Sequence, residues 1–153
     1  MARGIRVEDY DLIDYQAWAK EGIKGLEKSV SKKEFRFYKN GSKNLSALTK
    51  DITKVLNHKH FIYHQQRPKF SDLKKAFNKR AVCEVTLDAR TLDNREGFSL
   101  HRLVILDIND CQITFHDPRK EPRPARKEKI KLFKKAWLQA VSEPELCVYN
   151  RQK

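Results

Sequence analysis

The sequence predicts one α+β domain, with helices in its first half and an antiparallel sheet in its second half. The chain has 153 residues, a usual length for a single domain. Hydrophobic residues make up 39% of it, including eight Phe, five Tyr and two Trp, so an apolar core can form although 35% of the residues are charged. Apolar side chains recur at spacings of three and four in the first half and alternate at a spacing of two after residue 81.

The first half predicts three helices and a short strand. One helix starts near Asp14 and is interrupted by two glycines, which weaken a helix interior. A longer helix follows the breaker Asn40-Gly41, and its spacing predicts one apolar stripe made of Leu45, Leu48, Ile52, Val55 and Leu56. The segment HFIYH at 60–64 predicts a short strand. Ser71 is the expected N-cap of the third helix, SDLKKAFNK.

The second half predicts the sheet and one further helix. Apolar and polar residues alternate in AVCEVTLDA, HRLVILDI and CQITFHD, as they do in strands with one buried face. The helix that follows has one apolar face, formed by Ile130, Phe133, Trp137 and Val141. Residues 146–149 predict a last strand. We therefore expect N-terminal helices and a C-terminal antiparallel sheet.

Two of these strands form a hairpin whose register decides which side chains meet. Asn109-Asp110 is the turn signal. A strict two-residue turn pairs residues whose numbers sum to 219 and sets Arg102 opposite Asp117. A three-residue turn or one bulge makes the sum 218 and sets His101 opposite Asp117. We predict the second register, because it alone puts the apolar residues of both strands on one face: Leu103, Ile105, Ile113 and Phe115.

The predicted register brings the imidazole of His101 and the carboxylate of Asp117 within hydrogen-bonding distance. A carboxylate in that position fixes the tautomer and orientation of the histidine and stabilises its protonated form, as in a catalytic triad. A histidine at a strand start and an Asp-Pro turn after a strand also occur without any catalytic role. The spacing by itself leaves both interpretations open.

The order of motifs around this hairpin resembles the histidine–aspartate half of papain-like cysteine peptidases. GFSLH at 97–101 is followed by an apolar strand, a short turn, a second strand and Asp117-Pro118. The chain is most similar to the group related to the bacteriocin-processing peptidases, family thirty-nine of that class. In that group a segment like FSDLKKAFNKRAVCEVTLDAR precedes the hairpin, and a helix with an aromatic pair like Phe133 and Trp137 follows it.

The resemblance extends over residues 9–149 and is strongest at 70–137. It implies a papain-like half-barrel in which His101 is the general base and acid and Asp117 orients it. The implied activity of a complete relative is thiol-mediated hydrolysis of a peptide or amide bond. The implied partners are a peptide substrate or a chain that supplies the cysteine helix.

The chain departs from that group at the nucleophile. The group has a cysteine at a helix N-terminus, preceded by an oxyanion-hole glutamine, well before the histidine hairpin. Residues 1–82 contain no cysteine, and no Gln-x-x-x-x-x-Cys segment occurs. We therefore expect residues 1–153 to be a single peptidase-like domain that is truncated at its N-terminus, lacks the nucleophile helix and is inactive alone.

The three cysteines do not replace that nucleophile. Cys83, Cys111 and Cys147 lie in or beside the predicted strands and have no CxxC spacing, so we expect them to be buried and inert. Without the nucleophile helix, apolar residues should be exposed around Leu103, Ile105 and Phe115. Such a patch favours self-association or a partner that covers it.

The net charge of +13 allows two interpretations, a solvated basic surface or a site for a polyanion such as nucleic acid. The densest basic run is RKEPRPARKEKIKLFKK at 119–135, and no nucleic-acid-binding motif accompanies it. The longest aliphatic run is Leu103 to Leu106, and the N-terminus has no secretory signal, so we expect a cytoplasmic protein without a membrane span. The sequence predicts no cofactor.

Two further groups of polar residues have a functional and an ordinary interpretation. His60 and His64 share a strand face and, with a carboxylate from elsewhere, could bind a metal ion. Exposed histidines are the alternative, and the sequence shows no third ligand, so no metal site is predicted. Asp93 and Glu96, in the loop before the hairpin, could shape a substrate cleft or be solvated.

Three hypotheses on function remain open. The first is the peptidase-related domain. The second is a pseudoenzyme, a binding module that holds a peptide or a polyanion in the old cleft or on its basic surface. The third is a nucleic-acid-binding protein whose sheet only resembles the peptidase, for which binding should depend steeply on salt.

Overall fold

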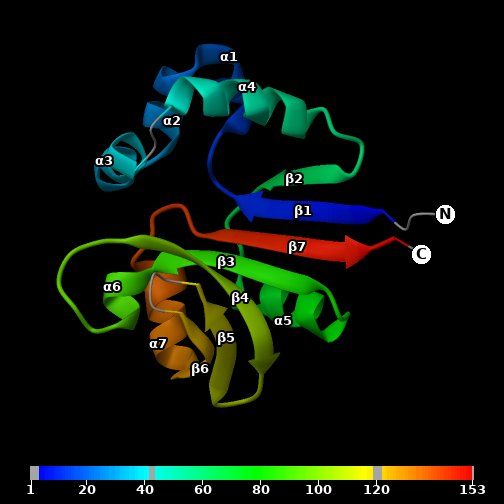
Figure 1. The fold of residues 1–153 in the computed structure, drawn as a ribbon, viewed down its shortest axis with the longest axis vertical. Coiled ribbons are helices and arrows are strands. Elements are labelled where there is room, and N and C mark those ends of the chain that lie inside the picture. Colours follow the sequence, from blue (N-terminus) through cyan, green and yellow to red (C-terminus); the bar gives the residue numbers. More distant parts are fainter. Residues whose placement is uncertain (1–3, 42–43, 119–121, 153) are drawn as a thin grey trace.

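A seven-stranded mixed sheet extends through the molecule in the order β2-β1-β7-β3-β4-β5-β6 (Figure 1). The structure is a computed structural model that describes residues 4–41, 44–118 and 122–152. Its strands are β1 (Ile5–Asp11), β2 (Phe61–Gln65), β3 (Val82–Asp88), β4 (Leu100–Ile108), β5 (Gln112–Asp117), β6 (Arg123–Lys129) and β7 (Glu145–Arg151). The α+β class predicted from the sequence is confirmed.

The expectation of a purely antiparallel sheet is wrong. β1 and β2 run parallel, while the other described neighbours run antiparallel. A parallel pair needs a long connection, and four helices supply it. The sequence analysis missed β1 and β6. β1 buries Asp9 and Asp11, and β6 is a mostly exposed, basic edge strand, so neither has a simple apolar alternation.

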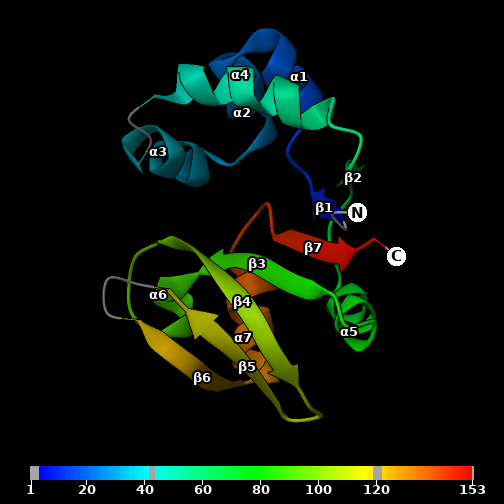
Figure 2. The ribbon, with the colours of Figure 1, turned by 45° about the vertical axis from the view of Figure 1, so that its right-hand side comes forward.

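The helices form two groups. They are α1 (Tyr15–Glu21), α2 (Ile23–Ser29), α3 (Lys32–Gly41), α4 (Leu45–Leu56), α5 (Phe70–Asn78), α6 (Ala89–Leu92) and α7 (Ile130–Lys134), which a π-helical turn, η1 (Lys135–Gln139), continues. In two views, α1–α4 lie together and apart from α5–α7 (Figures 1 and 2). We call residues 15–56 the helical cap. Among the described residues, no helix combines the length and the apolar character that crossing a membrane requires.

Each group of helices has its own hydrophobic core. The sheet core joins the strands to α5–α7 and η1, and its largest fully buried side chains include Trp137, Phe115 and Phe133. The cap core consists of Ile13, Trp18, Leu26 and Leu45. The first predicted helix is two helices, because Gly22 has a positive φ of 66° between α1 and α2.

Two details of the predicted helices are corrected. The stripe on α4 is only partly buried: Leu45 is 8% exposed, whereas Leu48 and Val55 are 41% and 45% exposed. The N-cap of α5 is Lys69, not Ser71, and the Asp72 carboxylate accepts a 2.8 Å hydrogen bond from the Lys69 backbone N–H. Residues 119–121, at the start of the densest basic run, lie outside the described residues.

Candidate functional site

The β4–β5 hairpin has the predicted faces but not the predicted register. Val104 pairs with His116 and Ile105 with Phe115, so the numbers of paired residues sum to 220 and not to 218. The even sum still places the apolar residues of both strands on one buried face: Leu103, Ile105, Ile113 and Phe115. The expectation that Leu103, Ile105 and Phe115 would be exposed is therefore wrong. The sheet core covers them.

The turn and a bulge together set this register. Asn109 donates its backbone N–H to the carbonyl of Gln112 at 3.0 Å, so the turn is centred one residue later than Asn109-Asp110. The Asn109 side chain also accepts hydrogen bonds from the backbone N–H groups of Cys111 and Gln112. A bulge between Ile105 and Asp107 then shifts the pairing by one residue.

The structure brings His101 and Asp117 together. His101 Nε2 lies 2.9 Å from Asp117 Oδ1. The Asp117 side chain has no exposed surface, and that of His101 is 24% exposed. A register sum of 220 sets Asp117 opposite Leu103, so the imidazole and the carboxylate meet diagonally on one face, a geometry that long side chains can span.

The Asp117 charge beside Nε2 makes the two ring nitrogens different. A carboxylate at Nε2 favours the tautomer that is protonated at Nε2, so Nδ1 keeps its lone pair. Among the described residues, the structure gives His101 Nδ1 no hydrogen-bonding partner. Nδ1 is therefore the atom that can take a proton from a reacting group beside the ring.

Arg126 holds the Asp117 carboxylate from the other side. Its Nη1 lies 3.3 Å from Asp117 Oδ2 and 2.8 Å from Asp93 Oδ1, and its Nη2 donates to the carbonyl of Leu92 and to Glu128. Sequence reasoning missed Arg126 because it stands in a basic run. The pairing of β5 with β6, which sets Arg126 beside Phe115, was not predicted.

The two loop acids have different environments. The Asp93 side chain is 8% exposed and contacts Arg126 and Arg123, so it is part of the ion-pair network that supports the site. Glu96 is exposed in the loop. Asp93 therefore has a structural contact, and neither acid reaches the His101 imidazole in the contacts of the described residues.

A cavity of about 270 Å³ opens beside the imidazole. Its lining residues are Ala89, Arg90, Asp93, Arg95, Ser99 and His101. The buried carboxylate of Asp88 fixes two walls of this cavity. It accepts hydrogen bonds from the backbone of Arg90 at the start of α6 and from the backbone N–H of Ser99 just before β4.

None of the three cysteines lines this cavity. Cys83 and Cys147 are buried, as expected, and burial raises the pKa of the Cys83 thiol to about 11. Cys111 is exposed, which contradicts the expectation that all three are buried. It lies in the β4–β5 turn, at the far end of the hairpin from His101, and its backbone carbonyl accepts a hydrogen bond from the backbone N–H of Ile130.

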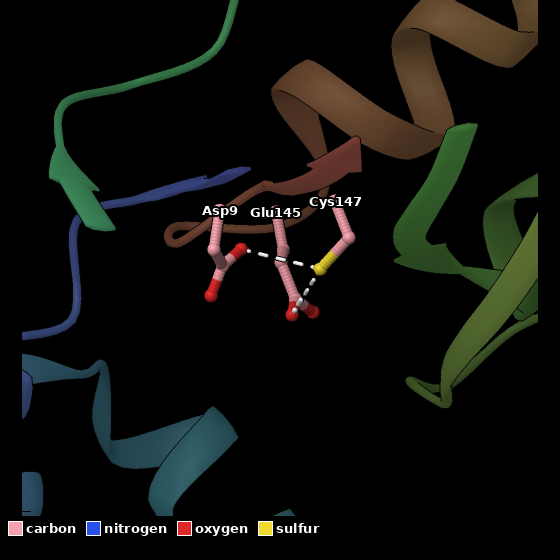
Figure 3. Close-up of side chains that lie close together, drawn as sticks. All are labelled: Asp9, Glu145 and Cys147. Carbon is pink, nitrogen blue, oxygen red and sulfur yellow. Dashed lines mark hydrogen bonds between the residues drawn. The ribbon is translucent and has the colours of Figure 1, made fainter. Parts of the chain in front are cut away.

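Cys147 belongs to a second polar cluster, with Asp9 and Glu145 (Figure 3). The Cys147 thiol donates to Asp9 Oδ1 at 3.2 Å and to Glu145 Oε1 at 3.4 Å. Burial, followed by the charges of Glu145 and Asp11, raises the pKa of Asp9 to about 8. Burial also raises the pKa of the Cys147 thiol well above its ordinary value.

These three side chains could offer one sulfur and two oxygen ligands to a metal ion. Arg102 already forms an ion pair with Glu145, and metal binding would have to displace protons from Asp9 and Cys147. The cluster is thus satisfied by a proton-sharing network.

The histidines considered as metal ligands have other contacts. His60 Nδ1 lies 3.0 Å from Gln152 Nε2, while His64 stacks on Tyr10 with ring centroids 4.3 Å apart. His64 Nε2 also lies 3.5 Å from Glu8 Oε2. Neither histidine belongs to a group of three metal-ligating side chains in the described part of the chain.

Together these features define an α+β domain with a buried-carboxylate–histidine pair at one end of its sheet. Comparison of the chain with models of protein families, with curated proteins and with solved structures gives no match.

Proposed function

We propose that this domain provides the histidine–aspartate half of a papain-like cysteine peptidase site and that a second polypeptide segment supplies the thiol. The single observation that supports the proposal most strongly is the 2.9 Å contact between His101 Nε2 and a fully buried Asp117 carboxylate. The hairpin faces and the helix with Phe133 and Trp137 agree with the half-barrel that the resemblance implies.

In the proposed reaction, His101 Nδ1 takes the proton of the incoming thiol. The thiolate attacks the carbonyl carbon of the substrate, and the imidazolium then gives the proton to the leaving amine as the C–N bond breaks. Water, deprotonated by the same nitrogen, cleaves the thioester and regenerates the thiol. Asp117 keeps the ring oriented and stabilises the imidazolium.

The proposal predicts the protonation pattern of the histidine before any thiol is added. Nitrogen NMR of the His101 ring should show a proton on Nε2 and a bare Nδ1 in the neutral form. Asp117→Ala should reduce this preference, because the acceptor at Nε2 is lost. A neutral ring protonated mainly at Nδ1 would contradict the assigned roles.

Activity is tested by adding a synthetic helix that carries a Gln-x-x-x-x-x-Cys segment and measuring cleavage of a mixed library of fluorogenic peptides. We expect thiol-dependent hydrolysis that His101→Ala abolishes and that Asp117→Asn lowers by about 10³-fold or more. His116→Ala is the matched control, because His116 is exposed and points to the opposite face of β5. Activity that survives His101→Ala would refute the proposal.

A non-catalytic binding module is the second candidate. The observation that favours it is that no described cysteine lines the cavity beside His101. Binding of peptides without hydrolysis in the complemented assay would support this candidate. Binding of nucleic acid with a steep salt dependence would instead support a polyanion-binding role for the basic surface.

A further inference from the structure

The cavity beside His101 contains two arginines that form no ion pair with any residue that the structure describes. Arg90 and Arg95 both line the cavity and are exposed. Within the described residues, neither guanidinium contacts a carboxylate. The nearest acid in the lining, Asp93, is already engaged by Arg126 and Arg123.

The backbone holds Arg90, in α6, close to Arg95, in the segment that follows this helix. The backbone N–H of Arg95 donates to the carbonyl of Arg90 at 2.8 Å. The buried Asp88 carboxylate accepts hydrogen bonds from the backbone N–H groups of Arg90 and Ser99. It therefore connects the start of α6 to the segment that leads into the strand carrying His101. The backbone of both arginines is therefore fixed close to the strand that carries His101.

From this geometry we infer that the cavity binds a carboxylate of the substrate, so that the substrates are acidic peptides. This inference rests on the proposed function and names its substrate class. A guanidinium binds a carboxylate through two parallel N–H···O hydrogen bonds, and the acid among the described lining residues, Asp93, is engaged by Arg123 and Arg126. A volume of about 270 Å³ holds one acidic side chain or a peptide C-terminus.

The lining favours a peptide over a nucleic acid. Proteins that bind single-stranded nucleic acid combine a basic groove with aromatic side chains on which bases stack. The described lining of this cavity contains no Phe, Tyr or Trp. Among the described lining residues, only Arg90 and Arg95 carry a permanent positive charge.

The test is an NMR titration in which the His101 ring and the Arg90 and Arg95 side chains are observed. The ligand is an acetylated and amidated hexapeptide with four glutamates, and its glutamine counterpart is the matched ligand. We expect the glutamate peptide to shift all three residues and to bind at least tenfold more tightly than the glutamine peptide.

Two double variants separate local from general charge effects. Arg90→Gln with Arg95→Gln should weaken binding of the glutamate peptide tenfold or more. Lys75→Gln with Lys79→Gln removes the same charge from exposed positions on α5 and at its C-cap, and should change binding less than twofold. Equal losses in the two double variants would overturn the inference. Tighter binding of a thymidine oligonucleotide at the same residues would also overturn it.

This experiment needs no nucleophile, so its outcome is separate from that of the proposed function. Hydrolysis in the complemented assay without a preference for glutamate would refute the acidic-substrate inference and leave the proposed function standing. Tight binding of the glutamate peptide at His101, without hydrolysis after complementation, would refute the peptidase proposal and leave an acidic-peptide site.

Discussion

Glu34 joins the helical cap to the sheet half of the molecule, and its removal should destabilise the whole fold. Its side chain is almost fully buried, with 2% of the residue exposed. Within the cap, it accepts hydrogen bonds from the backbone and hydroxyl of Ser31, in a capping box at the start of α3. Across the molecule, it accepts from the Ser142 backbone at 2.9 Å, from the Ser142 hydroxyl and from the Glu143 backbone at 3.3 Å.

The cost of Glu34→Ala can be worked from these contacts. Loss of the capping box costs about 1 kcal/mol. The backbone N–H groups of Ser142 and Glu143 lose their acceptor, at about 1 kcal/mol each because water can reach this loop. The expected loss is about 3 kcal/mol, a large part of the stability of a domain of this size.

Protonation should have a related effect. Burial alone would raise the pKa of Glu34, but hydrogen bonds from Ser142, Ser31 and the backbone of Glu143 outweigh it and hold the pKa below its ordinary value. Because the pKa of Glu34 is lower in the folded state than in the unfolded state, its ionised carboxylate stabilises the fold. This stabilisation is complete above the unfolded-state pKa of about 4.5 and is lost as the pH falls through the folded-state pKa. Glu34→Gln should have a lower free energy of unfolding at neutral pH. Its free energy of unfolding should also fall less on acidification, because glutamine cannot be protonated in this range.

Urea denaturation followed by tryptophan fluorescence tests both expectations. Trp18 reports on the cap core and Trp137 on the sheet core, so single-tryptophan versions follow the two halves separately. Glu27→Ala is the matched control, because Glu27 is exposed on α2, and it should change the free energy of unfolding by less than about 0.5 kcal/mol. A loss below about 1 kcal/mol in Glu34→Ala would refute the assigned role.

Three other perturbations have defined outcomes. An alkylating reagent at neutral pH should label exposed Cys111 at the rate of a peptide thiol, and Cys83 and Cys147 far more slowly. Mass spectrometry of the labelled peptides measures these rates. Fast labelling of Cys147 would contradict the structure. Burial and two nearby carboxylates raise the pKa of Asp9 from 3.8 to about 8. Between pH 3.8 and about pH 8 the folded state therefore retains a proton that the unfolded state releases, so the free energy of unfolding falls as the pH rises through this range. Asp9→Asn should remove this fall and add about 1–3 kcal/mol at pH 8 in urea denaturation; an unchanged pH profile would count against it. Arg67 donates to three carbonyls at the end of η1, so Arg67→Ala should cost about 1–2 kcal/mol, and Arg67→Lys should restore only part of it because lysine lacks the planar fork.

Patterns within single segments could be read from the sequence. The alternation in β3, β4 and β5 predicted these strands. An even register sum in the hairpin predicted that Leu103 and Phe115 share the buried face. The pairing of His101 with Asp117 followed from that parity. The two side chains still meet although the observed register sum is 220 and the predicted sum was 218, because His101 and Asp117 are diagonal neighbours on one face.

Contacts between distant segments could not be read in the same way. Asp9 and Asp11 give β1 a polar sequence, and only the packing of β7 and the helical cap against it explains why these acids are buried. Cys111 stands between Asp110 and Gln112, directly after the turn signal, and the hydrogen bond that closes the turn between Asn109 and Gln112 leaves it exposed.

The sequence by itself determined the α+β class, the strands of the hairpin and the two residues of the candidate site, because side-chain periodicity and strand parity depend on residues close together in the chain. The tertiary structure decided the register, the support of Asp117 by Arg126, the position of two arginines beside His101 and the link between Glu34 and Ser142. Each of these depends on which segments pack side by side, and the free energy of that packing is a property of the whole chain and not of any one segment.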